Sequence, residues 1–256
     1  MKIPSIHPED EESFLTTLNK KGFLLESKVG KILLNIVGEN GGLLTNYVID
    51  KEERREIDFV LEQTDHILII ECKKTDYSWI FPKDLEKGNT INLIYGDNRG
   101  IKVKSRQTSD FEVAWSDLSI LFDENGRLVR SNDKTVRTSN SEIHSHVRQA
   151  LKELEAYISH KAITGKIIIP LIVTNAKLFQ LKYSLDNIDS RGNLKKYESF
   201  KEIPGLLYNF PEVIKYKHKM STVRDDEVFS DHVKSIFILN MDHLKEMIPS
   251  ILDQNI

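Results

Sequence analysis

Three charged residues stand inside or at the end of apolar runs, and their types and spacing could do chemistry. Asp58 interrupts one such run, and Glu71 and Lys73 end the next. Unpaired charges are costly in a dry interior, so these residues indicate a bound cation, a buried ion pair or an edge open to solvent. Because alternate side chains of a strand share a face, Glu71 and Lys73 project together, whereas Cys72 points the other way.

The chemistry that this set favours is metal-assisted attack on a phosphodiester. Carboxylate oxygens prefer hard cations such as Mg²⁺ or Mn²⁺, and Asp58 and Glu71 could hold one while waters and a phosphate oxygen fill the remaining positions. A nearby ammonium group can orient the nucleophile or stabilise the transition state, which is the role expected for Lys73. A buried ion pair between either acid and Lys73 is the alternative.

Two helices are expected to flank these strands. Apolar residues recur at helical spacing through 24–37 and stop at the glycine-rich segment 38–42, which predicts a helix over Leu24–Val37. Glu26 lies beside its apolar stripe and either borders the core, pointing to the sheet, or is a solvated surface residue. An acidic run at 9–12 before Phe14 and Leu15 predicts a shorter first helix.

Three strands follow in the order of an antiparallel meander. They are expected near 43–50, 56–62 and 67–73, joined by short polar turns at 52–55 and 63–66. The third is apolar on both faces through 67–70, as expected of a central strand. Glu71 should therefore lie near the end of a buried strand.

Residues 76–140 are predicted to form a β-rich insertion, with short strands near 91–95 and 101–103 and a hairpin over 120–129 about Asn125 and Gly126. The insertion begins with an aromatic group that could pack in the core or offer a surface to bases, and core packing is favoured. This group comprises Tyr77, Trp79, Ile80 and Phe81.

The next helix begins with a capping box, Ser139 with Glu142, and carries an apolar stripe to Ile158. His146, Gln149 and Glu153 are spaced three or four residues apart and share one polar face. For His146 and Gln149, a solvated or structural role is the alternative to substrate contact.

A strand over 166–174, ending at Asn175, should then pair in parallel with an earlier strand through a right-handed crossover. Residues 177–256 are expected to extend the same sheet and helix layer: a strand to Leu185, an irregular region over 192–219, a strand near 233–239 and a closing helix over 242–252. The fold class is thus α/β, a single domain over 1–256 with a mixed β-sheet flanked by helices.

Composition narrows the class of protein. The 256 residues are 39% hydrophobic with a formal net charge of −3, so nucleic-acid contact would depend on local basic patches. No apolar run approaches the roughly 20 residues of a membrane span, and the polar start lacks the blocks of a secretory signal, so a cytoplasmic protein is expected. The single cysteine, Cys72, excludes an internal disulfide; it could be a nucleophile with His144 or His146, but a buried small hydrophobe is favoured.

The pattern of Asp58 followed by Glu71-Cys72-Lys73, each acid preceded by hydrophobic residues, resembles the PD-(D/E)xK, or restriction-endonuclease-like, nuclease superfamily. The resemblance extends from about Leu24 to Asn175 in an αβββαβ order. The segment 171–175 looks like the corresponding strand of Mrr-type restriction endonuclease-like proteins. One departure is that Ile57, not proline, precedes Asp58.

This resemblance implies roles for further residues. The backbone carbonyl of Cys72 would complete the metal shell, and Glu26 matches a helical acid that assists a second ion. Gln149 matches a glutamine found on the following helix in several branches. Candidate substrate contacts are Lys74, His146, Gln149 and Asn175.

The function expected from the resemblance is a Mg²⁺-dependent nuclease, with Mn²⁺ as a substitute, that hydrolyses DNA as an endonuclease in restriction, phage defence or DNA processing. A homodimer is expected by analogy with two-strand cleavage, and a protein partner in such a system would fit. The alternatives are a catalytically inactive nuclease-fold protein that binds nucleic acid or assembles with a partner, and an RNA nuclease.

Overall fold

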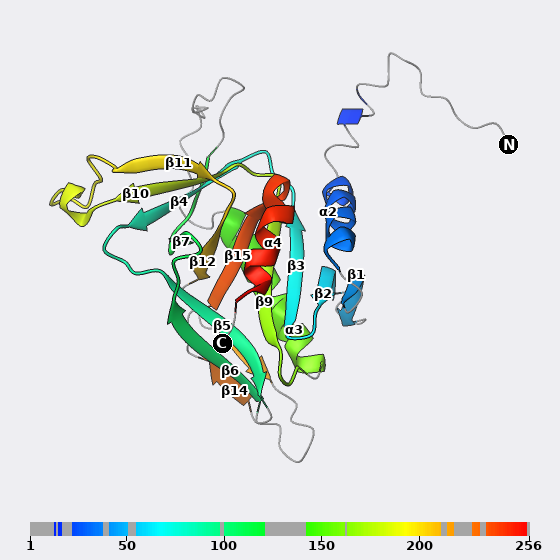
Figure 1. The fold of residues 1–256 in the computed structure, drawn as a ribbon. Helices are drawn as coiled ribbons and strands as arrows, with labels where there is room; N and C mark the ends of the chain where they lie inside the picture. The colour runs from blue at the N-terminus through cyan, green and yellow to red at the C-terminus, as the bar shows by residue number, and fades with distance from the viewer. Residues whose placement is uncertain are drawn as a thin grey trace.

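A mixed β-sheet with helices on both faces forms the body of the protein (Figure 1). The computed structural model describes residues 13, 15–16, 22–37, 41–50, 55–97, 100–120, 142–161, 163–210, 214–217, 227–230 and 234–254. Its helices are α2 (Phe23–Ile36), α3 (Glu142–His160) and α4 (Leu244–Leu252), with short 3-10 turns η1 (Leu185–Asn187) and η2 (Met241–His243).

The main sheet has nine strands in the described part of the chain, in the order β1-β2-β3-β9-β15-β12-β7, with β5 paired to the free part of β9 and β6 paired to β5. The pairings of β3 with β9 and of β9 with β15 are parallel, whereas β1, β2 and β3 form an antiparallel meander. The strands are β1 (Gly42–Asp50), β2 (Arg55–Glu62), β3 (His66–Lys73), β5 (Thr90–Asp97), β6 (Gly100–Gln107), β7 (Val113–Ala114), β9 (Ile167–Thr174), β12 (Gly205–Phe210) and β15 (Lys234–Asn240).

The centre of the sheet is the pair β3 and β9, whose apolar residues are buried on both faces. Their β-branched side chains fit a pleated surface covered on each side. Pro170 breaks the pattern of donors in β9, but β15 pairs with β9 only from Leu171 onward, so the proline stands beside the start of that ladder. Two hydrophobic cores hold this pair.

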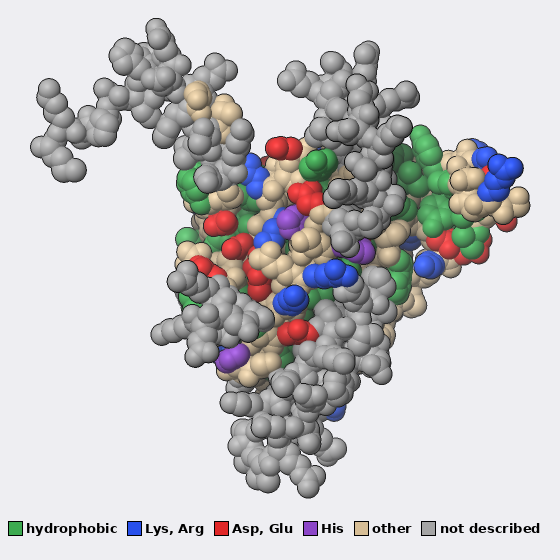
Figure 2. All heavy atoms as spheres, turned by 180° about the vertical axis from the view of Figure 1, so that it is seen from behind, with side chains coloured by type: hydrophobic (Ala, Val, Ile, Leu, Met, Phe, Trp, Pro, Cys, Tyr) green, Lys and Arg blue, Asp and Glu red, His purple; other side chains and the backbone are tan. Residues whose placement is uncertain are grey.

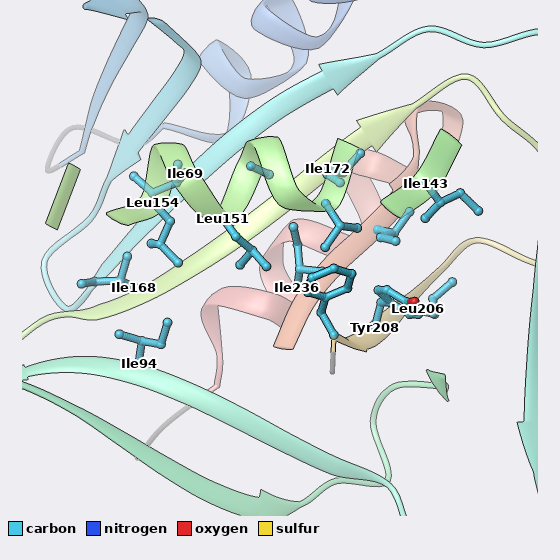
Figure 3. Packing of buried hydrophobic residues seen from close by; sticks show 14 of the residues in the cluster. Ile69, Ile94, Ile143, Leu151, Leu154, Ile168, Ile172, Leu206, Tyr208 and Ile236 are labelled. Carbon is cyan, nitrogen blue, oxygen red and sulfur yellow. The ribbon is translucent and has the colours of Figure 1, made fainter. Parts of the chain in front are cut away.

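The first core, here the α3-side core, lies between the sheet and α3. The second, the α2/α4-side core, lies on the opposite face beneath α2 and α4. Each large aliphatic side chain that is fully buried contributes about 1.5–3 kcal/mol, so β3 is held firmly from both sides. Figure 3 shows how side chains of α3 meet those of several strands in the α3-side core; the labelled residues are Ile69, Ile94, Ile143, Leu151, Leu154, Ile168, Ile172, Leu206, Tyr208 and Ile236.

A second, four-stranded sheet stands beside the main one, in the order β11-β10-β4-β8, and extends away from it in Figure 1. A further strand pair, β13 with β14, is antiparallel. These strands are β4 (Ser78–Asp84), β8 (Leu118–Ile120), β10 (Leu178–Tyr183), β11 (Ser199–Ile203), β13 (Ile214–Lys217) and β14 (Glu227–Ser230).

The main helices and strands lie within a few residues of their predicted positions, and the predicted parallel pairing of the strand over 166–174 is confirmed. The described part of the segment 76–140, predicted to be a β-rich insertion, contains five strands: β4 and β8 belong to the second sheet, and β5, β6 and β7 belong to the main one. Likewise 177–256 extends the main sheet only through β12 and β15, since β10 and β11 belong to the second sheet.

The region over 192–219, predicted to be irregular, contains β11, β12 and β13. Of the predicted first helix, Ser13, Leu15 and Thr16 are helical, and the rest lies outside the described residues, as do the hairpin about Asn125 and Gly126 and the cap at Ser139.

The aromatic group after β3 behaves mainly as core. Trp79, Ile80 and Phe81 are buried, and Tyr77 is exposed. A surface for bases therefore does not form from this segment. None of the described helices has the length and apolar character of a membrane span.

Candidate active site

The candidate site lies where β2 parts from β3. The two strands pair as far as Phe59 with Ile70, and one more step in that register places Asp58 opposite Glu71. From there β3 continues beside β9 to Lys73 without β2. The carboxylate of Asp58 replaces a backbone partner of β2 here, since its Oδ2 accepts a hydrogen bond of 2.7 Å from the backbone N–H of Cys72. Asp58 is thereby fixed at the opening between the strands.

A backbone distortion accompanies this opening. Asn46 of β1, which the register places opposite Asp58, has a φ of 49°, in the left-handed region. Phe59, which follows Asp58 in β2, packs in the α2/α4-side core, whereas Ile57, which precedes Asp58, packs in the α3-side core. The two strands therefore change faces at Asp58. Asparagine tolerates the left-handed region better than most residues, which explains how the turn is accommodated.

A chain of polar contacts runs from Glu71 to helix α3. The Lys73 ammonium donates to Glu71 Oε2 at 2.8 Å and to Gln149 Oε1 at 3.1 Å. The amide of Gln149 in turn donates to Glu153 Oε1 at 2.9 Å. Glu71 is 1% exposed and Glu153 is 5% exposed, so two buried carboxylates lie along this chain, one bound to the ammonium directly and the other through the Gln149 amide. The predicted proximity of Asp58, Glu71, Lys73 and Gln149 is present in the structure.

Carboxyl groups outnumber cationic groups here, and the pKa values of the acids are raised. Burial raises the pKa of Asp58 to about 7, with Glu71 adding to the effect. Burial, then a hydrogen bond to Glu71, raises the pKa of Glu153 to about 9. Burial alone would lower the pKa of Lys73, but the attraction of Glu71 outweighs it and the pKa is raised. The site thus holds a charged lysine and carboxyl groups that are reluctant to ionise together.

Two oxygens test whether this set of residues suits a cation. Glu71 Oε1 and Glu153 Oε2 are buried and lack a hydrogen-bond donor among the described residues. Such oxygens are expensive to leave unpaired. A proton shared between the two carboxyl groups satisfies them at low metal concentration, and a hard cation near Glu71 satisfies them otherwise. The residues therefore fit Mg²⁺ held by Asp58, Glu71 and the Cys72 carbonyl, with waters completing the shell.

This donor set is small. Within the described ranges no three histidine, cysteine, aspartate or glutamate side chains are grouped as a metal site. Mg²⁺ usually keeps several waters and takes only one or two protein carboxylates, so two acids and a carbonyl are in keeping with that ion.

The remaining predicted site residues lie at the edges of this cluster. Glu26 is half-buried in the first turn of α2, and its charge is the weakest of the five influences on the pKa of Asp58. Lys74 directly follows β3 and is half-buried. Cys72 is buried and burial raises the pKa of its thiol, which leaves it inert and agrees with the favoured sequence reading.

His146 and Asn175 are engaged elsewhere. His146 Nε2 lies 3.5 Å from Glu142 Oε1, near the start of α3. The Asn175 side chain holds the backbone of Thr75 at both ends, accepting from its N–H at 2.9 Å and donating to its carbonyl at 2.8 Å. Asn175 thus ties the segment after Lys73 to the end of β9, which accounts for its position without a substrate.

Glu153 was absent from the predicted site, although its spacing from Gln149 places it on the same helix face. The structure adds it through its burial and its contact with Gln149. The signal in the sequence is an acid beside the apolar stripe of α3, four residues after Gln149. The acidic, basic and histidine side chains on the α3 side of the molecule can be followed in Figure 2.

No protein-family model matches this chain, and neither the curated proteins nor the solved structures contain a match to it.

Proposed function

We propose that this protein is a metal-dependent phosphodiesterase that hydrolyses DNA, acting as an endonuclease in restriction, phage defence or DNA processing. The observation that carries the proposal is the convergence of Asp58, Glu71 and Lys73 where β2 parts from β3, with a buried Glu71 oxygen that has no hydrogen-bond donor among the described residues. The succession α2-β1-β2-β3, followed after the strands β4 to β8 by α3 and β9, supports a restriction-endonuclease-like core, since without those five strands it has the αβββαβ order of that fold.

The residues have separate parts in the reaction. Mg²⁺ bound by Asp58 and Glu71 would lower the pKa of a coordinated water and neutralise phosphate charge. Lys73 donates to Glu71 and Gln149, and its positive charge would orient the attacking water or stabilise the charge that develops on the phosphate oxygens. Gln149 holds the Lys73 ammonium, and Glu153 holds the Gln149 amide. Hydrolysis then adds water across one P–O bond, with no intermediate on the protein.

The decisive experiment compares Asp58→Asn and Lys73→Ala with the wild-type protein on plasmid, linear and branched DNA, with Mg²⁺ and with a chelator. We expect Mg²⁺-dependent cleavage that both variants lose, because one removes a carboxylate proposed to hold the metal and the other removes the ammonium proposed to act on the water and the phosphate. Lys28→Gln is the matched control, since it removes an exposed lysine that pairs with Asp242. Full cleavage by both site variants would contradict the proposal.

The same experiment separates the alternatives. Matched RNA substrates distinguish a DNA nuclease from an RNA nuclease. An inactive nuclease-fold protein would show no cleavage of any substrate and no heat of Mg²⁺ or Mn²⁺ binding in calorimetry.

Gln149 is a positioning residue in this scheme, because it acts through Lys73. We expect Gln149→Ala to lower kcat about tenfold, less than the roughly 10²–10⁴-fold typical of a group that transfers the proton itself, with KM changed less than twofold. Gln149→Glu should restore part of the rate, since a carboxylate can also hold the ammonium. A purely structural role would instead lower Tm and leave kcat of the folded fraction unchanged.

A further inference from the structure

A second cluster of charges lies on the other sheet, and its sign is opposite to that of the candidate active site. Lys83 of β4 is the direct cross-strand partner of Lys182 of β10. Lys201 of β11 pairs with Gln180, two residues before Lys182 on the same strand face. The three lysines therefore stand on one face of three neighbouring strands.

These lysines converge on a single acid. Glu112 Oε1 lies 3.0 Å from Lys182 Nζ and 2.8 Å from Lys201 Nζ, and its Oε2 lies 3.8 Å from Lys83 Nζ. Three ammonium groups meet one carboxylate, which leaves a surplus of two positive charges. The side chain of Lys83 is 9% exposed, that of Lys182 is 24% exposed and that of Lys201 is 50% exposed, so two of the three can reach a ligand.

The surplus of positive charge destabilises the protein when no anion is bound. Burial lowers the pKa of Lys83, and the charges of Lys182 and Lys201 add to this against the attraction of Glu112. Like charges placed directly across two strands are destabilising. On the same face, Gln180 is fully buried, and neither its amide nitrogen nor its oxygen has a hydrogen-bond partner among the described residues. An anion at this place would offset the repulsion.

The cluster is within reach of a long ligand that also occupies the candidate active site. Lys83 follows Lys73 by ten residues, which limits the separation of their Cα atoms to about 35 Å. That upper limit does not exceed one turn of a DNA duplex, about 34–36 Å, so a duplex of two turns is long enough to contact both places. Trp79 and Phe81, which share the strand face of Lys83, belong to the α3-side core, and Glu71 and Lys73 meet α3 on that side of the main sheet.

We propose that Lys182 and Lys201, supported by Lys83, bind a backbone phosphate of the nucleic acid whose cleavage takes place at Asp58, Glu71 and Lys73. The inference rests on the proposed function for the identity of the polymer. The lysines hold the duplex in place and read no sequence, because phosphate contacts position a protein without distinguishing bases. Glu112 spaces the two exposed ammonium groups and moderates their affinity.

The test measures binding separately from cleavage. A labelled DNA duplex of about two turns is titrated with wild-type protein in a chelator, at salt concentrations between about 50 and 200 mM. We expect the double variant K182Q/K201Q to bind at least about tenfold more weakly at the lowest salt, with a salt slope smaller by about one phosphate contact. The matched control K28Q/K195Q removes two lysines that pair with Asp242 and Asp189, and its affinity should stay within about threefold of wild type.

A third variant tests whether added positive charge in the cluster raises the affinity for DNA. Glu112→Gln removes the only carboxylate of the cluster, so DNA binding should tighten by about tenfold at low salt even if Tm falls. A cluster that serves only stability would show weaker or unchanged binding.

Each result decides something. Equal affinities for K182Q/K201Q and K28Q/K195Q, with cleavage intact, overturn the phosphate site and leave the proposed function standing. A reduced salt slope in K182Q/K201Q without any cleavage by wild type supports the site and overturns the nuclease. Stabilisation of wild type but not of K182Q/K201Q by inorganic phosphate, without a difference in duplex binding, overturns the backbone assignment in favour of a small phosphate ligand.

Discussion

Glu112 and Glu153 are glutamates at two charge clusters, and their carboxyl groups behave in opposite ways. Burial would raise the pKa of both. At Glu153 the neighbouring Glu71 adds to that effect and the pKa rises to about 9. At Glu112 the hydrogen bonds from Lys201 and Lys182 overcome it, and the pKa falls to about 2. The difference lies in the sign of the surrounding charges rather than in the residue type.

Neither cluster would be electrically neutral if all of its groups were ionised. The cluster at Asp58, Glu71 and Glu153 has one lysine for three acids, whereas the cluster at Glu112 has one acid for three lysines. Perturbed groups of this kind gather at functional sites as well as in ion-pair networks. A cation would balance the first and an anion the second, and a nucleic-acid backbone with its metal ion supplies both.

The largest expected effect comes from removing an acid from the negative cluster. Asp58→Asn should reduce Mg²⁺-dependent cleavage by at least about 10³-fold, or about 4 kcal/mol of transition-state stabilisation. In the metal-free protein the same change relieves repulsion with Glu71, so Tm should stay constant or rise. Cleavage assays paired with thermal melts in chelator check both halves. A variant that loses Tm together with activity would mean that Asp58 is structural.

The corresponding change in the positive cluster should do the reverse. Glu112→Gln leaves three lysines without a partner, and we expect it to lower the free energy of unfolding by about 1–2 kcal/mol after allowing for the exposure of Lys201. The expected fall in Tm is about 2–8 °C. Urea denaturation of wild type and variant measures it. An unchanged midpoint would show that the ion pairs of Glu112 add nothing to stability.

The two clusters should also respond to pH in opposite directions. Asp58 and Glu153 have raised pKa values, so the folded protein holds protons that the unfolded chain releases, and this stability is lost as pH rises from about 4 through about 7 and 9. Glu112 has a lowered pKa, so its stability is lost as pH falls from 4.5 towards about 2. Melts in chelator should therefore show Tm falling by a few degrees between pH 5 and pH 9.

Two additions sharpen the pH experiment. Saturating Mg²⁺ should flatten the alkaline decline, because metal binding favours the ionised carboxylates. Glu153→Gln should flatten it in chelator as well. A flat profile in the wild-type protein without metal would contradict the surplus of negative charge.

The smallest effect is expected where an ion pair is already balanced. Lys28 and Asp242 lie 3.2 Å apart with side chains 57% and 70% exposed. Solvent screens such a pair, so Lys28→Gln should change the free energy of unfolding by less than about 0.5 kcal/mol. A larger change in the denaturation midpoint would mean that exposed pairs matter as much as the two clusters.

Much of the negative cluster follows from the sequence because strand alternation and helix spacing are local rules. Glu71 and Lys73 share a face by alternation, and Gln149 and Glu153 share one by helical spacing. The meander is equally local, since short polar turns join neighbouring strands. That the clustered residues act together was a prediction of the resemblance and stays one.

The positive cluster could not be predicted from the sequence. Lys83, Glu112, Lys182 and Lys201 are far apart in the chain and meet only because β4 and β10 pair in parallel across almost one hundred residues. Register between distant strands depends on tertiary packing, which local periodicity does not encode. The strands within 192–219 were not predicted for a related reason, since buried and exposed residues alternate only weakly in β11, which lies at a sheet edge.

The change of face at Asn46 and Asp58 has a mechanical consequence. Beyond that point the β1–β2 hairpin rests on α3, where Tyr47 meets Tyr157 edge to face at 5.9 Å between ring centres and Lys161 lies over the Tyr47 ring. Helix α3 therefore packs against β1, which pairs with the strand that carries Asp58, and it also carries the glutamine that binds Lys73. A tilt of this one helix would act on the hairpin that bears the acid and on the lysine together.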